Sequence, residues 1–229
     1  MKIGGLQRVS LNDYPGKICA TVFTRGCNFR CPYCHNPELV DPGQYVPVIP
    51  EKEVLSFLDN RRGKLDAVTV SGGEPTLQKD LEKFLGELKN MGYLVKLDTN
   101  GSNPDMLSIL INKQRVDYIA MDFKGPLKKY GQIVSVKADV SRIRRSSELI
   151  MTSGIGHEFR TTVVRSQLDL EDLMSMAKII RQARLYVLQP FVAKKTLDRA
   201  FLSETPYAPE EFATFREVLE KKGLKVVVR

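Results

Sequence analysis

The alternation of short apolar segments with amphipathic ones constrains the fold of this chain more than any other feature. Segments rich in β-branched residues end at glycine or polar residues, and stretches with apolar residues at helical spacing follow them. This rhythm predicts an α/β fold with parallel strands inside and helices outside. We expect strands over residues 17–26, 66–73, 93–101, 117–125, 157–165, 184–191 and 224–229, and helices over 51–62, 77–92, 104–114, 141–154, 169–183 and 208–223.

The number of strand–helix units narrows the architecture. About six full units fall short of the eight of a closed barrel, which leaves an open barrel or a doubly wound sheet. No linker interrupts the rhythm, so we expect a single domain over residues 1–229. Both architectures place their sites at the carboxyl ends of the strands. Polar or glycine residues stand there in each predicted strand, which predicts one shared site.

Three of the four cysteines, Cys27, Cys31 and Cys34, follow the first predicted strand within eight residues. Disulfides are disfavoured because the chain has no apolar run of membrane length and no signal-peptide core, which predicts a reducing cytoplasmic location. A structural zinc site needs four ligands, and His35 is the obvious candidate for the fourth. A 4Fe–4S cluster held by three thiolates would leave one iron open. We interpret Cys19 as a buried thiol of the hydrophobic core.

The net charge of +8 indicates attraction to acidic partners. Lysine and arginine are dispersed, and no nucleic-acid-binding motif appears, so the sequence disfavours nucleic acid as a partner. The densest basic patch, residues 141–146, is best explained as a solvated helix face. No membrane partner is expected.

The spacing Cys-x3-Cys-x2-Cys, with Tyr33 before the last cysteine, resembles the cluster loop of the radical S-adenosylmethionine superfamily. A second motif, "SGGEP" over residues 71–75, stands at the next strand exit and strengthens the resemblance. The resemblance implies a partial, open TIM-type barrel with a 4Fe–4S cluster on Cys27, Cys31 and Cys34. It also implies that S-adenosylmethionine chelates the open iron and is cleaved reductively to a 5′-deoxyadenosyl radical, with no side chain acting as the catalytic group.

Further residues are implied to contact the cofactor. Their motifs are the cysteine loop, "SGGEP", "LDTNG", "MDFKG" and "FRTTVV", and the residues are Tyr33, Cys34, His35, Gly72, Gly73, Glu74, Asp98, Asn100, Asp122, Phe123, Lys124 and Arg160. Each motif also has a structural reading. Gly72 to Pro75 suit a tight strand-to-helix turn, Asn100 suits an Asn-Gly turn, and Asp122 suits an ion pair with Lys124.

Within the superfamily, the segment from Leu11 to Pro126 is most similar to the activases of glycyl radical enzymes, particularly those of anaerobic ribonucleoside-triphosphate reductase. This resemblance implies hydrogen abstraction from a glycine of a partner enzyme, with flavodoxin or ferredoxin as the electron donor. Lys17, Arg25 and Arg30 stand near the cysteines as candidate docking charges, although ordinary solvent-facing charges explain them too.

The sequence departs from the activases in places and leaves other functions open. "DYPGK" over residues 13–17 differs from their usual DGPG, and the predicted strand over 184–191 lacks the histidine of the formate-lyase activases. No cysteines remain for a second cluster. One alternative is a radical enzyme that acts on a small molecule, as 7-carboxy-7-deazaguanine synthase does. Another is a metal-dependent binding module.

Overall fold

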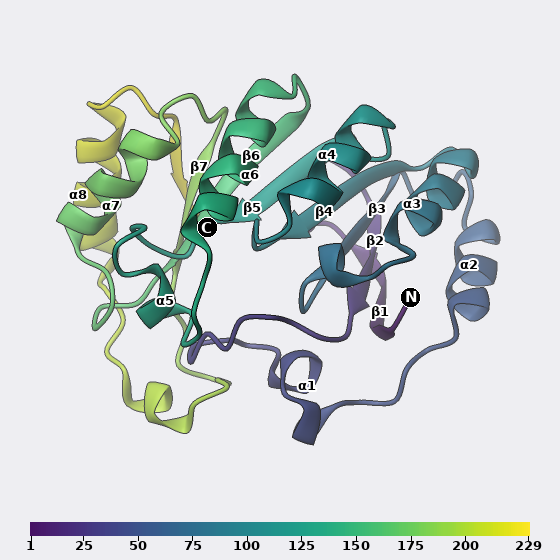
Figure 1. Ribbon diagram of the computed structural model, residues 1–229, viewed down its shortest axis with the longest axis horizontal. Helices are drawn as coiled ribbons and strands as arrows, with labels where there is room; N and C mark the ends of the chain where they lie inside the picture. The colour runs from purple at the N-terminus through teal and green to yellow at the C-terminus, as the bar shows by residue number, and fades with distance from the viewer. The chain divides into compact units, whose positions relative to one another are not determined.

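In the computed structural model, which describes residues 1–229, strands and helices alternate along the chain (Figure 1). The strands are β1 (Ile3–Ser10), β2 (Cys19–Thr24), β3 (Ala67–Gly72), β4 (Leu94–Thr99), β5 (Tyr118–Asp122), β6 (Gly156–Val163), β7 (Tyr186–Pro190) and β8 (Val226–Val228). The helices are α1 (Pro37–Val40), α2 (Glu51–Asp59), α3 (Leu81–Asn90), α4 (Pro104–Asn112), α5 (Tyr130–Ile133), α6 (Val140–Thr152), α7 (Leu170–Ile179) and α8 (Pro209–Glu220). Three short 3-10 helices are η1 (Pro42–Gln44), η2 (Pro75–Leu77) and η3 (Arg199–Ser203).

The chain forms two compact units. The first consists of Met1–Asn28, Glu38–Thr99 and Asp105–Ile119, and the second of Phe29–Pro37, Asn100–Pro104 and Ala120–Arg229. The boundary falls inside β5, between Ile119 and Ala120, where the sequence shows no linker. The single-domain organisation therefore stays a prediction.

In the first unit, β2, β3 and β4 are parallel, and β1 pairs with β2 in the antiparallel sense. The β2–β3 register runs from Cys19 opposite Ala67 to Thr24 opposite Gly72. The carboxyl ends of these strands therefore lie at one edge. The apolar face of α3 (Leu81, Phe84, Leu85 and Leu88) is completely buried, as its helical spacing predicts.

In the second unit, β6, β7 and β8 are parallel, with Phe159 opposite Tyr186 and Tyr186 opposite Val226. Helix α7 begins at a reciprocal capping box in which Asp169 accepts from the Asp172 amide and Asp172 accepts from the Asp169 amide. This cap explains why the helix begins where its acidic first turn predicts.

The hydrogen-bonded strand order follows the chain from β1 to β8 and has two ends, so the sheet is not closed. The predicted α/β fold with an open, mostly parallel sheet is confirmed and is consistent with a partial TIM-type barrel. Strand β1 was not expected, because Gly4 and Gly5 interrupt its apolar pattern. No helix combines the length and the apolar character that crossing a bilayer requires.

Candidate functional site

The second half of the cysteine loop is a tight turn. The Cys34 amide donates to the Cys31 carbonyl at 3.0 Å, with Pro32 in the position where a β-turn favours proline. A β-turn brings its first and fourth residues together, so the backbone places the Cys31 and Cys34 side chains at the same turn. None of the four cysteines forms a disulfide.

Two segments of the second unit hold this turn in place. The Arg30 amide donates to the Val134 carbonyl at 2.9 Å, and the Phe29 ring meets the edge of Tyr130, beside α5. On the chain after β7, the Asp198 amide donates to the Pro32 carbonyl at 2.9 Å. The loop conformation is therefore fixed by long-range backbone contacts.

His35 is held by the segment that follows β7. Its Nε2 atom lies 3.0 Å from the Val192 carbonyl oxygen, and its ring stacks on Phe191 with 5.9 Å between the ring centroids. Tyr33 is buried, with 4% of its surface exposed. Both residues that flank Cys34 are thus anchored in the second unit.

Burial determines the protonation state of the Cys31 thiol. It raises the pKa of Cys31 to about 11, although the nearby Lys124 ammonium acts in the opposite direction. At neutral pH the thiol is therefore protonated in this environment. Metal ligation requires the thiolate, and a bound metal would supply the positive charge that compensates for deprotonation of this sulfur. The chemistry of a buried thiol in a three-thiol loop fits an iron–sulfur cluster.

In the first unit, the "SGGEP" turn joins the exit of β3 to the start of the cysteine loop. The Gly73 amide donates to the Thr24 carbonyl at 2.9 Å, and the Glu74 amide donates to the Gly26 carbonyl at 2.8 Å. Gly72 adopts a φ of +115°, and a Cβ on Gly73 would lie 2.2 Å from the Gly26 oxygen. The backbone approach to Thr24 and Gly26 thus explains why both positions are glycine.

Glu74 has a structural function in this turn. Its side chain is completely buried, and Oε1 accepts hydrogen bonds from the Thr76 amide at 3.0 Å and from the Thr76 and Thr99 hydroxyls. Glu74 also serves as the N-cap of η2. This carboxylate oxygen therefore fixes the exit of β3 against the exit of β4.

Asp98 lies near the carboxyl end of β4 with two partners in the same unit. Its Oδ1 pairs with the Lys96 ammonium, which is 2% exposed, and its Oδ2 accepts from the Ser71 hydroxyl at 3.1 Å. Burial of a lysine requires such a partner. The carboxylate is thus held in one orientation.

Asp122, at the end of β5, is the centre of an ion cluster in the second unit. It pairs with the Arg160 Nε at 2.9 Å and with the Lys124 Nζ at 3.0 Å. Burial alone would raise the pKa of Asp122, but Arg160 and Lys124 lower it well below its usual range. The expected Asp–Lys pair is present, and Arg160 extends it. Phe123 points away into the core against Phe159.

Asn100 forms the turn that its sequence favours. Its side-chain oxygen accepts from the Ser102 amide at 2.9 Å, and the residue is 5% exposed. This is an Asx turn, as the Asn-Gly pair predicts.

The predicted site residues are divided between the two units. Cys27, Gly72, Gly73, Glu74 and Asp98 belong to the first unit. The second unit contains Cys31, Tyr33, Cys34, His35, Asn100, Asp122, Phe123, Lys124 and Arg160. The predicted core role of Cys19 is confirmed, because it is fully buried and 3.8 Å from the Thr69 hydroxyl.

Sequence reasoning missed residues that support the site without belonging to a motif. Tyr130 is completely buried, and its hydroxyl lies 3.4 Å from the Lys124 amide. Phe191, Val192 and Asp198 hold the cysteine loop from the segment after β7. The contacts of Phe191, Val192 and Asp198 join segments far apart along the chain, so no local pattern signals them.

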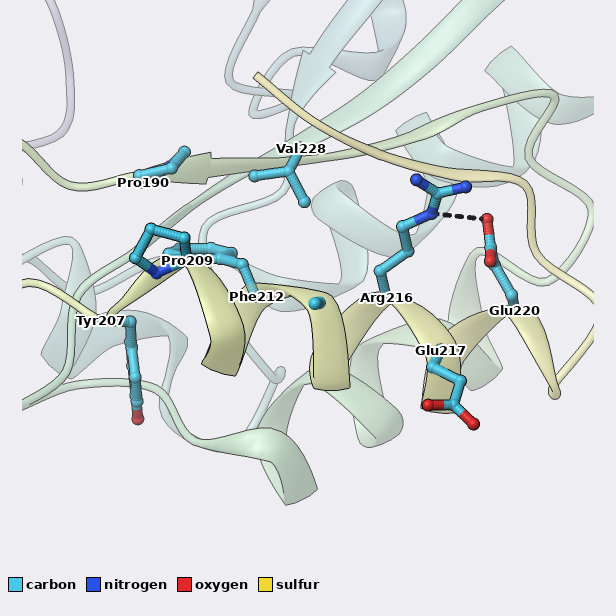
Figure 2. A pocket seen from close by; sticks show the side chains of 9 residues that line it. Pro190, Tyr207, Pro209, Phe212, Arg216, Glu217, Glu220 and Val228 are labelled. Atoms are coloured by element: carbon cyan, nitrogen blue, oxygen red, sulfur yellow. Dashed lines mark hydrogen bonds and ion pairs between the residues drawn. The ribbon is translucent and has the colours of Figure 1, made fainter.

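A cavity of about 540 Å³ beside α8 is separate from these residues (Figure 2). Figure 2 shows Val228 across from Phe212, with the Arg216–Glu220 ion pair at one end. None of the predicted site residues lines it; its lining consists of Pro190, Tyr207, Pro209, Phe212, Ala213, Arg216, Glu217, Glu220 and Val228. These residues come from β7, β8, α8 and the segment just before α8.

Comparisons with known proteins agree with the cysteine loop. The chain is 32% identical to the "putative glycyl-radical enzyme activating enzyme MJ1227" of Methanocaldococcus jannaschii, over 99% of this chain and 95% of that protein. It is 43% identical to the pyruvate formate-lyase-activating enzyme of Staphylococcus aureus over 93 residues, which cover 38% of this chain and 37% of that enzyme.

Proteins of known structure share this fold. The crystal structure of Streptococcus suis SuiB bound to S-adenosylmethionine matches 89% of this chain with a TM-score of 0.70 and 13% identity. The match covers 48% of SuiB, so this chain spans about half its length. The family model described as "Radical SAM superfamily" matches residues 21–183. The chain therefore belongs to the radical SAM superfamily, and a 4Fe–4S cluster and S-adenosylmethionine are its cofactors.

Proposed function

We propose that this chain is an activase that generates a glycyl radical in a partner enzyme. The observation that carries the proposal is the 32% identity to MJ1227 over nearly the whole of both chains. Short matches could reflect the shared cofactor alone. A match of this extent includes the second half of the chain as well, where superfamily members with other substrates have no reason to resemble an activase.

Cys27, Cys31 and Cys34 are the proposed cluster ligands. The three cysteines of the loop form no disulfide, and the turn from Cys31 to Cys34 is held by backbone hydrogen bonds at both Arg30 and Pro32. When bound, the cluster and S-adenosylmethionine supply a 5′-deoxyadenosyl radical that can take a hydrogen atom from carbon. The protein's part is to place these groups and to exclude water.

The residues predicted to contact S-adenosylmethionine act in two ways in this proposal. Gly72, Gly73 and Glu74 shape the strand exit beside the start of the cysteine loop, and their backbone presents the polar groups for the methionine end. Asp122 and Arg160 supply charge in the second unit. Arg160 donates through Nε to Asp122, and the planar geometry of a guanidinium suits recognition of a carboxylate.

The remaining predicted contacts complete this cofactor site. Tyr33, Cys34 and His35 are proposed to border the adenine, on a loop anchored at Pro32 and Val192. Lys124 and Phe123 are proposed for the opposite wall, and Asp98 and Asn100 for ribose or carboxylate groups. The ordered orientations of Asp98 and Lys124 support these roles, since a preorganised polar group need not rearrange on binding.

Anaerobic ribonucleoside-triphosphate reductase is the proposed partner. The support is the resemblance of the "LNDYPGK", "YCHNPE", "DTNG" and "MDFKGP" segments to its activases. A glycine is a suitable target, because its Cα lacks a side chain and its radical can be shared with both adjacent peptide groups. The activity is proposed for the cytoplasm.

Flavodoxin or ferredoxin is the proposed electron donor, since the net charge of +8 favours an acidic partner. Two of the candidate docking residues differ in their contacts. Arg25 stacks over the Tyr45 ring at 4.8 Å and donates to the Val46 carbonyl at 2.8 Å, so it stabilises its own loop. Lys17 is exposed and remains a candidate. Reversal of the Lys17 charge is expected to slow reduction of the cluster by the donor protein at low salt. The same substitution should leave the rate of reduction by dithionite unchanged.

An anaerobic assay tests the activase proposal. The reconstituted chain, S-adenosylmethionine and dithionite should form 5′-deoxyadenosine, and addition of the reductase should give a glycyl radical signal in electron paramagnetic resonance. Deuteration of the glycines in the partner enzyme should collapse the hyperfine splitting of this radical signal. Formation of 5′-deoxyadenosine with turnover of a deazapurine precursor, and without a protein radical, would favour the small-molecule alternative. Zinc without iron and sulfide would favour the binding module.

A further inference from the structure

The hydroxyl of Tyr33 is an unusual polar group in this structure. The residue is 4% exposed, and its hydroxyl oxygen is buried without a partner that satisfies hydrogen-bond geometry. A phenol keeps its proton at neutral pH, so the group is available as a donor. A buried hydroxyl without a partner costs free energy, so its retention calls for a physical reason.

Other buried tyrosines have partners in the same structure. The Tyr93 hydroxyl donates to the Leu58 carbonyl at 2.6 Å, and the Tyr186 hydroxyl donates to the Thr161 hydroxyl at 3.0 Å. The Tyr130 hydroxyl lies 3.4 Å from the Lys124 amide, which donates to it. The unpartnered hydroxyl of Tyr33 is therefore not a general property of buried tyrosines here.

The surroundings of Tyr33 identify the acceptor. Tyr33 lies two residues after Cys31, inside the turn that the Cys34 amide closes on the Cys31 carbonyl, and Cys31, Lys124, Tyr130 and Asp122 are its electrostatic neighbours. The Asp122 carboxylate already accepts from Lys124 and Arg160, so the Cys31 sulfur is the acceptor that remains for the Tyr33 hydroxyl. Lys124 and the Tyr130 hydroxyl are engaged elsewhere, with the Asp122 carboxylate and the Lys124 amide respectively.

We propose that, once the cluster is bound, the Tyr33 hydroxyl donates a hydrogen bond to the Sγ atom of Cys31 and makes the cluster easier to reduce. This inference rests on the proposed role of Cys31 as a cluster ligand. The thiolate is a stronger acceptor than the thiol, so ligation strengthens the contact. One-electron reduction adds negative charge to the cluster and its sulfurs, and a donor at a sulfur stabilises that charge.

The position of the tyrosine suits this function. Tyr33 lies inside the turn that joins Cys31 to Cys34, and the Asp198 amide holds this turn at Pro32. The aromatic ring is packed in the interior, so its hydroxyl has little freedom to turn toward solvent. Tyr33 is thus a positioning residue that tunes the cluster through a ligand sulfur.

The test is a reductive titration of the cluster without S-adenosylmethionine, followed by electron paramagnetic resonance in the wild-type chain and in Tyr33→Phe. The variant keeps the ring and removes only the donor. We expect its midpoint potential to be more negative, with the iron content unchanged. Tyr186→Phe is the matched control, because it removes a buried hydroxyl that bonds Thr161 instead; its potential should equal that of the wild type.

A second substitution keeps the test decisive if Tyr33→Phe fails to fold. Replacement of Tyr33 by 3-fluorotyrosine retains the ring and makes the hydroxyl a stronger donor, so the potential should become less negative. An unchanged potential in either loaded variant would overturn the proposal. Failure of the ligand assignment is distinguishable, because Cys31→Ala would then hold as much iron as the wild-type chain before any potential is measured.

Discussion

Gly73 lies directly against the backbone of Gly26, and a Cβ on Gly73 would stand 2.2 Å from the Gly26 carbonyl oxygen. Gly26 immediately precedes Cys27, the first cysteine of the loop. Gly73→Ala should therefore displace the start of the cysteine loop. We expect a loss of about 1–3 kcal/mol in the free energy of unfolding, as for other overpacked sites, and fewer irons per chain after reconstitution.

Gly43→Ala is the control for this substitution. Its Cβ would meet nothing closer than the Asp41 carboxylate at 3.6 Å, so stability and iron content should stay near wild type. Equal iron content in Gly73→Ala and wild type would show that the contact with Gly26 does not position the loop. Urea denaturation and iron analysis provide the two measurements.

Iron content should distinguish substitutions of the three loop cysteines from a substitution of Cys19. Cys27→Ala, Cys31→Ala and Cys34→Ala are each expected to lose the cluster and the formation of 5′-deoxyadenosine, while the fold is largely kept. Cys19→Ala should retain both, because Cys19 is fully buried beside Thr69 at the start of β2. Iron, sulfide and 5′-deoxyadenosine are measured in parallel. Retained product in Cys31→Ala would refute its role as a ligand.

Asp122→Asn should destabilise the second unit. The substitution removes the anion that Arg160 and Lys124 share, and the side chains of these two cations are each only 15% exposed. Solvent reaches part of Asp122, so we expect a loss of about 1–3 kcal/mol in the free energy of unfolding. The variant should also weaken binding of S-adenosylmethionine, measured by calorimetry on the loaded chain.

Lys128→Gln is a suitable control for the Asp122 prediction, since it changes a nearby exposed charge that takes no part in this cluster. It should alter neither stability nor affinity. Unchanged stability in Asp122→Asn would mean that the ion cluster contributes nothing, despite its depressed carboxyl pKa.

The sequence predicted the elements well wherever local pattern and tertiary structure agree. Helix α3 shows this agreement, because its leucines and Phe84 have helical spacing and are all buried. Strand β1 shows the opposite case. Its two glycines and half-exposed residues give no strand pattern, and its pairing with β2 stabilises it instead.

The candidate site was predictable where a residue type has one chemical use. Three thiols in one loop indicate a metal centre from the sequence alone. The glycines of "SGGEP" are implied to contact the cofactor, and the structure adds a packing reason for them, because the backbone of Thr24 and Gly26 occupies the space that a Cβ would need. The contact of Asp198 with Pro32 spans more than 160 residues of chain, as the numbering shows, and no local pattern predicts it.

His157 should make the stability of the fold depend on pH near neutrality. It is 2% exposed, its Nδ1 atom lies 2.9 Å from the Ile155 carbonyl, and its Nε2 accepts from the Arg184 amide at 3.2 Å. These contacts require the neutral ring with its proton on Nδ1, since a proton on Nε2 would face the Arg184 amide hydrogen. Burial accordingly lowers the pKa of His157 from 6.5.

The sign of the pH effect follows from this lowered pKa. Above the unfolded value the ring is neutral in both states, and its stabilising contribution is complete. As the pH falls below about 6.5, the unfolded chain binds a proton that the folded chain resists, and stability declines with a slope of at most about 1.4 kcal/mol per pH unit. Urea denaturation between about pH 7.5 and 5.5 should show this decline. His157→Gln keeps a hydrogen-bond donor and an acceptor but does not titrate, so its free energy of unfolding should vary less with pH. An equal slope in the wild-type and variant chains would mean that other groups cause the pH dependence.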